Sequence, residues 1–332
     1  MTAYSDQQRL RQTDFKRSWP DLPSAARDEG VYRKRLYPFV LPTAYAVHNL
    51  WEPIRKPVLA HFHAHDIAWH DGINKGCVDD RAPSPHLLDS QVCAINFWWG
   101  LGRSREALTT VLRLVFDDVR TAVPPVGDSP IVDMEWVGQE SYLGEHGWPS
   151  RGEYTTSADL LLAYEDPSGR RHGVLVESKY TESYATGEWL DRGSKGRTRL
   201  ATYKPLLERP DSPITKDTDL GLRDLLIEPF YQHLRQQLLA TGMERKRELD
   251  FETVTCLHVS PRANRAFHTG MTAPRMKEFG DTVGVAWQAI LCRPNRYRSI
   301  HYEDLFASTI RIADPSVEDW TEYQSARYGW GQ

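Results

Sequence analysis

Two apolar segments joined by a short turn constrain the fold of this 332-residue chain more than any other feature. The segments Ser157–Tyr164 and Gly173–Tyr180 both have the composition and length that are typical of strands. The residues between them include Pro167 and Gly169, which favour a reversal of the chain. The sequence therefore predicts an antiparallel hairpin.

Charged side chains occur on both strands of this hairpin. Asp159 lies on the first strand, and Glu177 and Lys179 lie on the second. Because side chains alternate along a strand, Glu177 and Lys179 share one face, whereas Val176 and Ser178 point to the other, which we expect to be more buried. Antiparallel pairing brings Asp159 level with Glu177. We therefore expect two carboxylates and one ammonium to converge on one patch of the sheet.

Two carboxylates brought together in a protein interior require a neutralising partner. Burying both is costly unless a cation compensates them. A hard divalent ion such as Mg²⁺ prefers oxygen ligands and keeps several water molecules. A lysine beside that ion suits polarising a water molecule or steadying a phosphate oxygen. We expect an Mg²⁺ site here, in which Mn²⁺ substitutes.

Helical and strand patterns flank the hairpin on both sides. We expect one helix from Leu88 to Trp99 and a second that begins after an N-cap at Ser104. Later helices are expected over Glu228–Glu244, Tyr302–Ile310 and Val317–Tyr328. Strands are expected at Ile131–Val137, Phe251–Ser260 and Thr282–Leu291. This order predicts an α/β fold with a mixed central sheet flanked by helices. The expected divisions are an irregular N-terminal extension (1–85) with a short strand near Val58–His63, a core (86–310), and a C-terminal helix packing on the core (311–332).

The pattern Asp159 followed by Glu177-x-Lys179 on adjacent strands, with helices before and after, resembles the PD-(D/E)xK nuclease superfamily. Further pieces resemble a bacterial branch of restriction endonuclease-like proteins: Ser90, Gln91 and Asn96 on the first helix, residues 177–182, and residues 231–236 on the later helix. The resemblance implies a restriction endonuclease-like core over about residues 86–310, with extensions at both ends.

The resemblance also implies chemical roles for the hairpin residues. Asp159 and Glu177 would bind the metal, and the carbonyl of Ser178 would add a ligand. Lys179 would help to activate the attacking water. The implied activity is a Mg²⁺-dependent DNA endonuclease of restriction, defence or repair type, which leaves 5′-phosphate and 3′-hydroxyl ends.

The sequence departs from the superfamily pattern at two positions. Ala158 stands where the name-giving proline would be. The superfamily often has a glutamate on the first core helix, where this chain offers only Asp89 and Gln91. Either Gln91 replaces that glutamate as a hydrogen-bonding group, or Glu135 on the preceding strand approaches the metal.

Basic and amide side chains beyond the hairpin are candidates for nucleic-acid contacts. Lys195, Arg197 and Arg199 belong to a basic run whose glycines suggest a mobile loop that contacts phosphates. Gln232 and Arg235 share one face of the later helix. A solvated loop and a solvated helix face are the alternatives.

Two other functions compete with the nuclease hypothesis. His61 and His63 would share a face of a strand and hold Zn²⁺, as in amidohydrolases, which the segment 57–63 loosely resembles. The remaining chain lacks the regular alternation of strands and helices of an eight-fold barrel. A non-catalytic nucleic-acid-binding protein with the same fold is the third possibility, against which the intact Asp159, Glu177 and Lys179 argue.

Charge and composition limit the location and the partners. The net charge of −4 excludes a histone-like basic protein, although residues 170–300 carry more basic than acidic side chains. No segment reaches the roughly 18 continuous apolar residues of a membrane helix, the N-terminus has no secretory pattern, and the four cysteines form no CxxC pair. We expect a cytoplasmic protein that acts on DNA, with RNA left open. Cleavage of both strands would favour a homodimer.

Overall fold

A six-stranded mixed sheet forms the centre of the structure, a computed structural model that describes residues 3–73, 81–128, 130–152, 154–184 and 189–331. The strands of this sheet are β3 (Thr121–Val123), β4 (Asp133–Trp136), β5 (Ala158–Glu165), β6 (Arg171–Ser178), β7 (Phe251–Ser260) and β8 (Tyr297–His301). Their order is β3-β5-β6-β7-β8, and β4 pairs with β5 on the same side as β3. The predicted β5–β6 hairpin is confirmed as antiparallel, whereas β6–β7 and β7–β8 pair in parallel.

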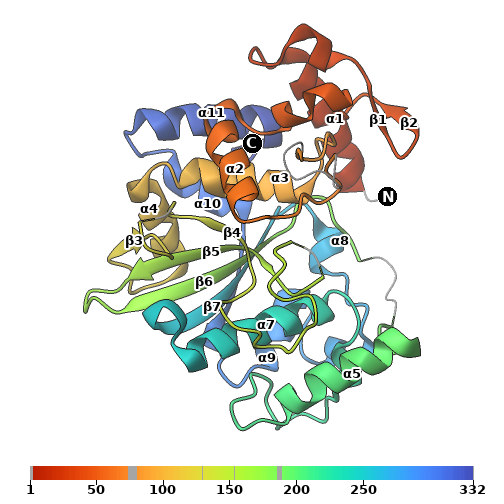
Figure 1. The fold of residues 1–332 in the computed structure, drawn as a ribbon, viewed down its shortest axis with the longest axis vertical. Coiled ribbons are helices and arrows are strands. Elements are labelled where there is room, and N and C mark those ends of the chain that lie inside the picture. Colours follow the sequence, from red (N-terminus) through yellow and green to blue (C-terminus); the bar gives the residue numbers. More distant parts are fainter. Residues whose placement is uncertain (1–2, 74–80, 129, 153, 185–188, 332) are drawn as a thin grey trace.

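Helices cover both faces of the sheet (Figure 1). One layer contains α1 (Ala3–Ser18), α2 (Glu52–Ala64), α3 (Ser90–Ala94) with its π-helical continuation Ile95–Trp99, α4 (Arg105–Val115), α10 (Tyr302–Thr309) and α11 (Pro315–Tyr328). The other side carries α5 (Gly193–Leu207), α6 (Leu222–Leu225), α7 (Phe230–Lys246), α8 (Arg265–His268) and α9 (Val283–Ala289). A small separate ribbon is formed by β1 (Gly30–Tyr32) and β2 (Arg35–Tyr37). The fold class is therefore the α/β arrangement that the sequence predicts.

Both faces of the hairpin are buried, so the expectation that one face is clearly more buried is wrong. Leu160 and Val176 belong to the apolar cluster beneath α3 and α4, and Leu161 and Leu175 belong to the cluster beneath α7. None of these four side chains is more than 2% exposed. A strand covered on both sides reads as a continuous apolar run, as β5 does. Glu177 and Lys179 consequently lie in a largely dry setting, whereas Asp159 is half-buried.

The N-terminal residues are not an irregular extension, because α1 and α2 occupy much of the first 64 residues. The strand expected near Val58–His63 is part of α2. The sequence also predicts a loop at Asp79–Pro85, whose first two residues lie outside the described residues. Side chains of these segments, such as Phe15 and Trp51, join the same apolar cluster as Leu160 of the sheet. The division at residue 85 stays a prediction about the chain.

Polar contacts join α1 and α11 to the end of β6. Gln12 Nε2 donates to Tyr180 Oη and to the carbonyl of Arg327, both at 2.9 Å. Tyr180 Oη in turn donates to Gln8 Oε1 at 2.9 Å. Because Tyr180 follows Lys179 directly, the N-terminal helix holds the segment that carries the candidate lysine. No helix among the described residues is long and apolar enough to span a membrane.

Candidate active site

The register of the hairpin sets Asp159 opposite Glu177. Leu160 pairs with Val176, so the next positions along the two antiparallel strands, Asp159 and Glu177, face one another. The backbone N–H of Ser178 donates to Asp159 Oδ2 at 2.6 Å. The structure thus brings the two carboxyl groups together where β6 ends, as the sequence pattern predicts.

Lys179 and Glu177 form a buried ion pair at the end of β6. Lys179 Nζ donates to Glu177 Oε1, which also accepts from Gln232 Nε2 at 2.6 Å. The other oxygen, Oε2, accepts from Gln236 Nε2. Glu177 is 1% exposed and Lys179 is 9% exposed. Gln232 and Gln236 are one helical turn apart, so α7 places two amide donors on a single carboxylate.

Burial and mutual repulsion perturb the ionisation of this group. Burial raises the pKa of Asp159 well above its usual value, the Glu177 carboxylate adds to the rise, and Lys179 opposes it. Burial acts to lower the pKa of the Lys179 ammonium, but Glu177 and the other acidic groups around it together outweigh that effect and raise this pKa well above its usual value. The cluster therefore has an excess of negative charge that an additional cation would relieve.

Glu135 lies beside Asp159 on the opposite side from Glu177. The β4–β5 register places Glu135 opposite Asp159, and its backbone has a left-handed φ of 51°. Its Oε1 accepts from Gln91 Nε2 at 2.7 Å, and its Oε2 accepts from Ser157 Oγ at 2.8 Å. Such backbone conformations cost on the order of 1 kcal/mol and concentrate at functional sites. Gln91 and Glu135, which the sequence offered as alternatives, are in direct contact.

His70, which the sequence analysis did not assign to the site, lies beside Glu135. The backbone N–H of His70 donates to Gln91 Oε1 at 2.8 Å, and His70 Nε2 lies 3.8 Å from Glu135 Oε1. Burial raises the pKa of Asp89, the N-cap of α3, to about 7. The signal that pointed to this region was the density of histidine and aspartate in residues 61–71.

Glu228, which precedes α7, is an acid that the sequence analysis did not assign to the site. Burial raises the pKa of its carboxyl group, whereas Arg235 and Lys179 oppose that rise. Its neighbour Gln232 accepts a hydrogen bond from Tyr184 Oη at 3.2 Å through its own Oε1. Nothing in the sequence distinguishes Glu228 from the other acidic residues, because only the folded chain brings it to Lys179.

The basic run forms the helix α5 and not a mobile loop. The structure explains why glycine is needed at two positions of this run. Gly193 has a φ of 65°, and a Cβ on Gly196 would lie 2.1 Å from the carbonyl carbon of Asp191. Lys195 and Arg199 are one turn apart and line a pocket together with Arg235 of α7. Arg197 is exposed and lies outside the lining of that pocket. Gln232 lies in the centre, on Glu177.

The histidine cluster lies on a helix, so the geometry expected for a zinc-binding strand is wrong. Residues two apart on a helix point in nearly opposite directions, and His61 is buried whereas His63 is exposed. His61 Nε2 lies 3.3 Å from Asp133 Oδ1, and its ring packs 5.0 Å from that of Trp99. The structural basis of the amidohydrolase alternative is therefore lost.

The chemistry of the donor set at Asp159 and Glu177 fits a hard divalent cation. Both side chains offer carboxylate oxygens, and an ion that keeps most of its water ligands needs few protein ligands. Among the described residues, three acidic or histidine ligand atoms lie within 4.8 Å of one another only at Asp118, Asp166 and His172. That group sits at the opposite end of the hairpin, where Asp166 accepts hydrogen bonds of the turn.

Comparison with known proteins gives a family match over nearly the whole chain. A family described as restriction endonuclease associating with ARP matches residues 9–329, which includes α2, the hairpin and α11. Neither the curated proteins nor the solved structures contain a significant match. The N-terminal helices and the sheet therefore both lie within the range that the family matches.

Proposed function

The chain belongs to the family of restriction endonucleases associating with ARP, and on that premise we propose that it is a Mg²⁺-dependent endonuclease that cuts DNA. Membership in a restriction endonuclease family supports a nuclease of restriction or defence type and implies DNA as the substrate. The family description names an association with ARP, which we extend to this chain as part of the proposal.

One observation supports the catalytic assignment most directly. Asp159 and Glu177 face one another at the end of a buried hairpin, and Lys179 is ion-paired with Glu177. Water is largely excluded there, which strengthens every electrostatic interaction with a phosphate group. An ordinary surface Glu–Lys pair would be exposed and would need no second carboxylate beside it.

Each residue has a distinct task in the proposed reaction. Asp159, Glu177 and the carbonyl of Ser178 would hold the metal, which when bound supplies Lewis-acid stabilisation of the developing charge and a more acidic water. Lys179 orients the attacking water or a phosphate oxygen through its ammonium protons. Glu135, held by Gln91, is the proposed third acid.

Gln232 and Gln236 act on the carboxylate of Glu177 and not on the substrate. Their amide groups donate to its two oxygens, so the carboxylate has a fixed orientation before any substrate arrives. Metal ligands that surrounding hydrogen bonds hold in place bind the metal more tightly, and the site is more active. We assign both glutamines as positioning residues.

Cleavage assays with purified protein test the proposal. Plasmid DNA, single-stranded DNA and RNA are incubated with Mg²⁺, with Mn²⁺ or with a chelator. We expect DNA cleavage with either metal and none with the chelator. Asp159→Asn should lower the cleavage rate at least about 100-fold, since it removes a charged ligand of the metal.

A matched control separates this effect from a general loss of charge. Asp117 is exposed and follows α4, so Asp117→Asn makes the same chemical change away from the site. It should cut at the wild-type rate. Equal cleavage by the Asp159→Asn and wild-type proteins would disprove the assigned metal site, and cleavage of RNA alone would change the substrate class.

A further inference from the structure

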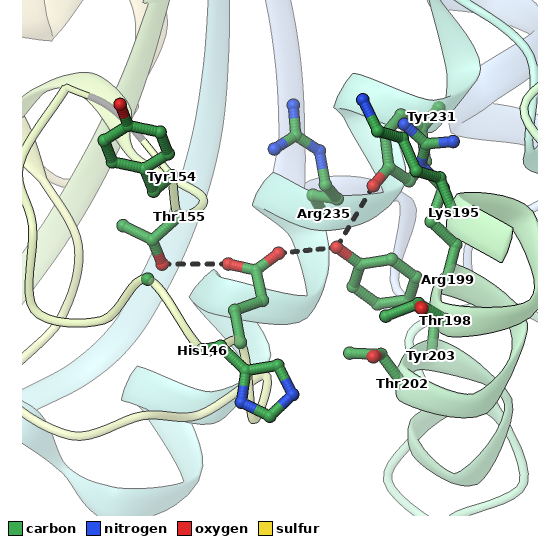
Figure 2. Close-up of a pocket in the computed structure, with 12 residues that line it drawn as sticks. His146, Tyr154, Thr155, Lys195, Thr198, Arg199, Thr202, Tyr203, Tyr231 and Arg235 are labelled. Carbon is green, nitrogen blue, oxygen red and sulfur yellow. Dashed lines mark hydrogen bonds between the residues drawn. The ribbon is translucent and has the colours of Figure 1, made fainter.

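A cavity of about 410 Å³ opens next to the proposed catalytic centre and has no role in the reaction described above. Its walls come from α5, from α7 and from the loop that precedes β5 (Figure 2). Lys195 and Arg199 belong to α5, Arg235 belongs to α7, and Tyr154 belongs to the loop. A volume of this size accommodates a small organic ligand such as one nucleotide.

The cavity is coupled to the centre through α7. Arg235 is three residues after Gln232 and one residue before Gln236, the two side chains that hold Glu177. The carboxyl group of Glu228 is influenced by Arg235 on the cavity side and by Lys179 on the catalytic side. A ligand that contacts Arg235 therefore lies close to the proposed catalytic centre at Glu177 and Lys179.

The cations of the cavity form no ion pair at salt-bridge distance, although the carboxylates of Glu145 and Glu228 lie near Arg235. Among the described residues, none of Lys195, Arg199 and Arg235 forms a salt bridge. The Nε atom of Arg235 is buried without a hydrogen-bond partner, and its Nη1 reaches Thr156 Oγ1 only at 3.4 Å. A partly buried guanidinium with an unused donor is costly unless an anion completes its hydrogen bonds. The guanidinium fork suits the oxygens of a phosphate.

The single carboxylate of the cavity, Glu145, is already occupied. It accepts hydrogen bonds from Thr155 Oγ1 at 2.9 Å, from Thr156 at its backbone N–H and hydroxyl, and from Tyr203 Oη at 2.5 Å. Figure 2 shows the bonds from Thr155 and Tyr203, which link the loop to α5 across the cavity. Glu145 therefore joins the two walls, and the three cations outnumber it.

Aromatic rings complete the cavity. The guanidinium groups of Arg199 and Arg235 lie 5.3 and 4.7 Å from the ring centre of Tyr231, which holds both near the same place. Tyr154, at the opposite wall, is 80% exposed. An exposed aromatic ring that lines the same cavity as a group of cations is the arrangement that proteins use to stack a base and bind its phosphate.

We propose that this cavity binds one nucleotide of the DNA strand, with its phosphate on Lys195, Arg199 and Arg235 and its base against Tyr154. The proposal rests on the proposed function, because it takes the substrate to be DNA. It adds a binding subsite of defined place and chemistry. A free nucleotide carries the same phosphate and base, so the experiment has to distinguish the two sources.

Binding of short DNA duplexes and single strands, measured with a chelator present to prevent cleavage, tests the subsite. In a series of oligonucleotides, one phosphate at a time is replaced by an uncharged methylphosphonate. The wild-type protein should lose about ten-fold in affinity at one position. The double variant Lys195→Ala/Arg199→Ala should bind unmodified DNA about ten-fold more weakly and should not respond to that replacement. The slope of log Kd against log salt should fall by about one.

A control and a third variant keep the test independent of folding. Arg105→Ala removes an exposed cation from α4, far from α5 in Figure 1, and should bind like the wild type. Tyr154→Ala, at an exposed position, should weaken binding of single strands more than that of duplexes. The subsite is overturned if the double variant binds unmodified DNA as tightly as the wild type or responds equally to the replaced phosphate.

The remaining arms separate this inference from the nuclease proposal. In one outcome, the wild type binds deoxyadenosine monophosphate at micromolar concentration and the double variant does not, with the same DNA affinity in both proteins. That result would make the cavity a site for a free nucleotide and would overturn its assignment to the DNA strand. Cleavage by the wild type with an unaffected double variant contradicts the subsite alone. Phosphate-specific binding without cleavage in Mg²⁺ or Mn²⁺ contradicts the nuclease proposal alone.

Discussion

His258 Nε2 lies 3.0 Å from Gln236 Oε1, and the amide nitrogen of the same glutamine donates to Glu177. Because that amide oxygen is an acceptor, His258 must carry its proton on Nε2. Its Nδ1 is buried without a hydrogen-bond partner. A neutral histidine of β7 thereby fixes the direction in which Gln236 presents its amide group to the carboxylate.

Removing this support should lower activity without touching the substrate. His258→Leu removes the donor to Gln236, so the amide can rotate away from Glu177, and we expect a roughly 10- to 100-fold weaker apparent affinity for Mg²⁺. His258→Gln places an amide donor near the same point and should recover part of the loss. Cleavage rates across a Mg²⁺ titration check this. A purely structural role predicts equal effects of the two variants and an unchanged Mg²⁺ dependence.

The pair of Glu177 with Lys179 allows stability and activity to be separated. Lys179→Met leaves a carboxylate buried without its cation, which costs about 3–5 kcal/mol when one partner of a buried ion pair is removed. The double variant Glu177→Gln/Lys179→Met removes both charges and should recover most of the free energy of unfolding. Neither variant should cut DNA. Urea unfolding and plasmid cleavage measure the two properties.

Two results would contradict that prediction. If Lys179→Met is as stable as the wild type, the ion pair is screened by water and the site is wetter than its burial indicates. If the double variant retains cleavage, the two residues do not carry the reaction.

The sequence predicted the hairpin and α7 because their signals are local. Apolar runs, a turn at Pro167 and Gly169, and the apolar stripe of α7 each depend on neighbouring residues. The proximity of Asp159 and Glu177 followed from the turn and the antiparallel pairing of the two strands. The contacts of Glu177 with Gln232 and Gln236 did not, since they depend on how α7 packs across the sheet.

The elements that were predicted wrongly from the sequence have either no regular spacing of apolar residues or a misleading one. The helix α1 buries polar side chains, among them Gln8, Gln12 and Lys16, so its buried face was not recognised. The Lys16 ammonium donates to the carbonyls of Asp28 and Val40 at 2.7 and 2.8 Å. The segment expected as the strand Thr282–Leu291 contains the helix α9, where the hydroxyl of Thr282 caps the first turn.

Acidification should destabilise the protein through its buried histidines. Burial lowers the pKa of His233 to about 4, and burial together with His233 lowers the pKa of His258 well below its usual value. Each residue is neutral in the folded state and binds a proton more readily when unfolded. Their contribution is therefore fully present above about pH 6.5 and is lost as the pH falls towards 4.

The histidine contribution can be isolated by substitution. For His233 it amounts to at most roughly 3 kcal/mol. His233→Asn keeps a donor near the carbonyl of Pro229 but does not titrate, so its free energy of unfolding should fall less between pH 7 and pH 4.5. Urea unfolding at the two pH values measures this. An equal fall in both proteins would assign the acid sensitivity to carboxyl groups instead.

The N-terminal helices should be required for folding of the sheet domain. Phe15, Trp51 and Trp320 share one apolar cluster with Leu160 of β5, so a fragment comprising residues 86–332 would expose that cluster to water. At about 25 cal/mol for each Å², roughly 400 Å² of newly exposed apolar surface would cost about 10 kcal/mol, which is comparable with the usual stability of a whole domain. We expect the fragment to be insoluble or to lack a cooperative thermal transition, whereas a fragment starting at residue 3 should unfold like the full chain. Cooperative unfolding of the 86–332 fragment would show that the sheet and its later helices fold alone, and that the N-terminal segments are an accessory to them.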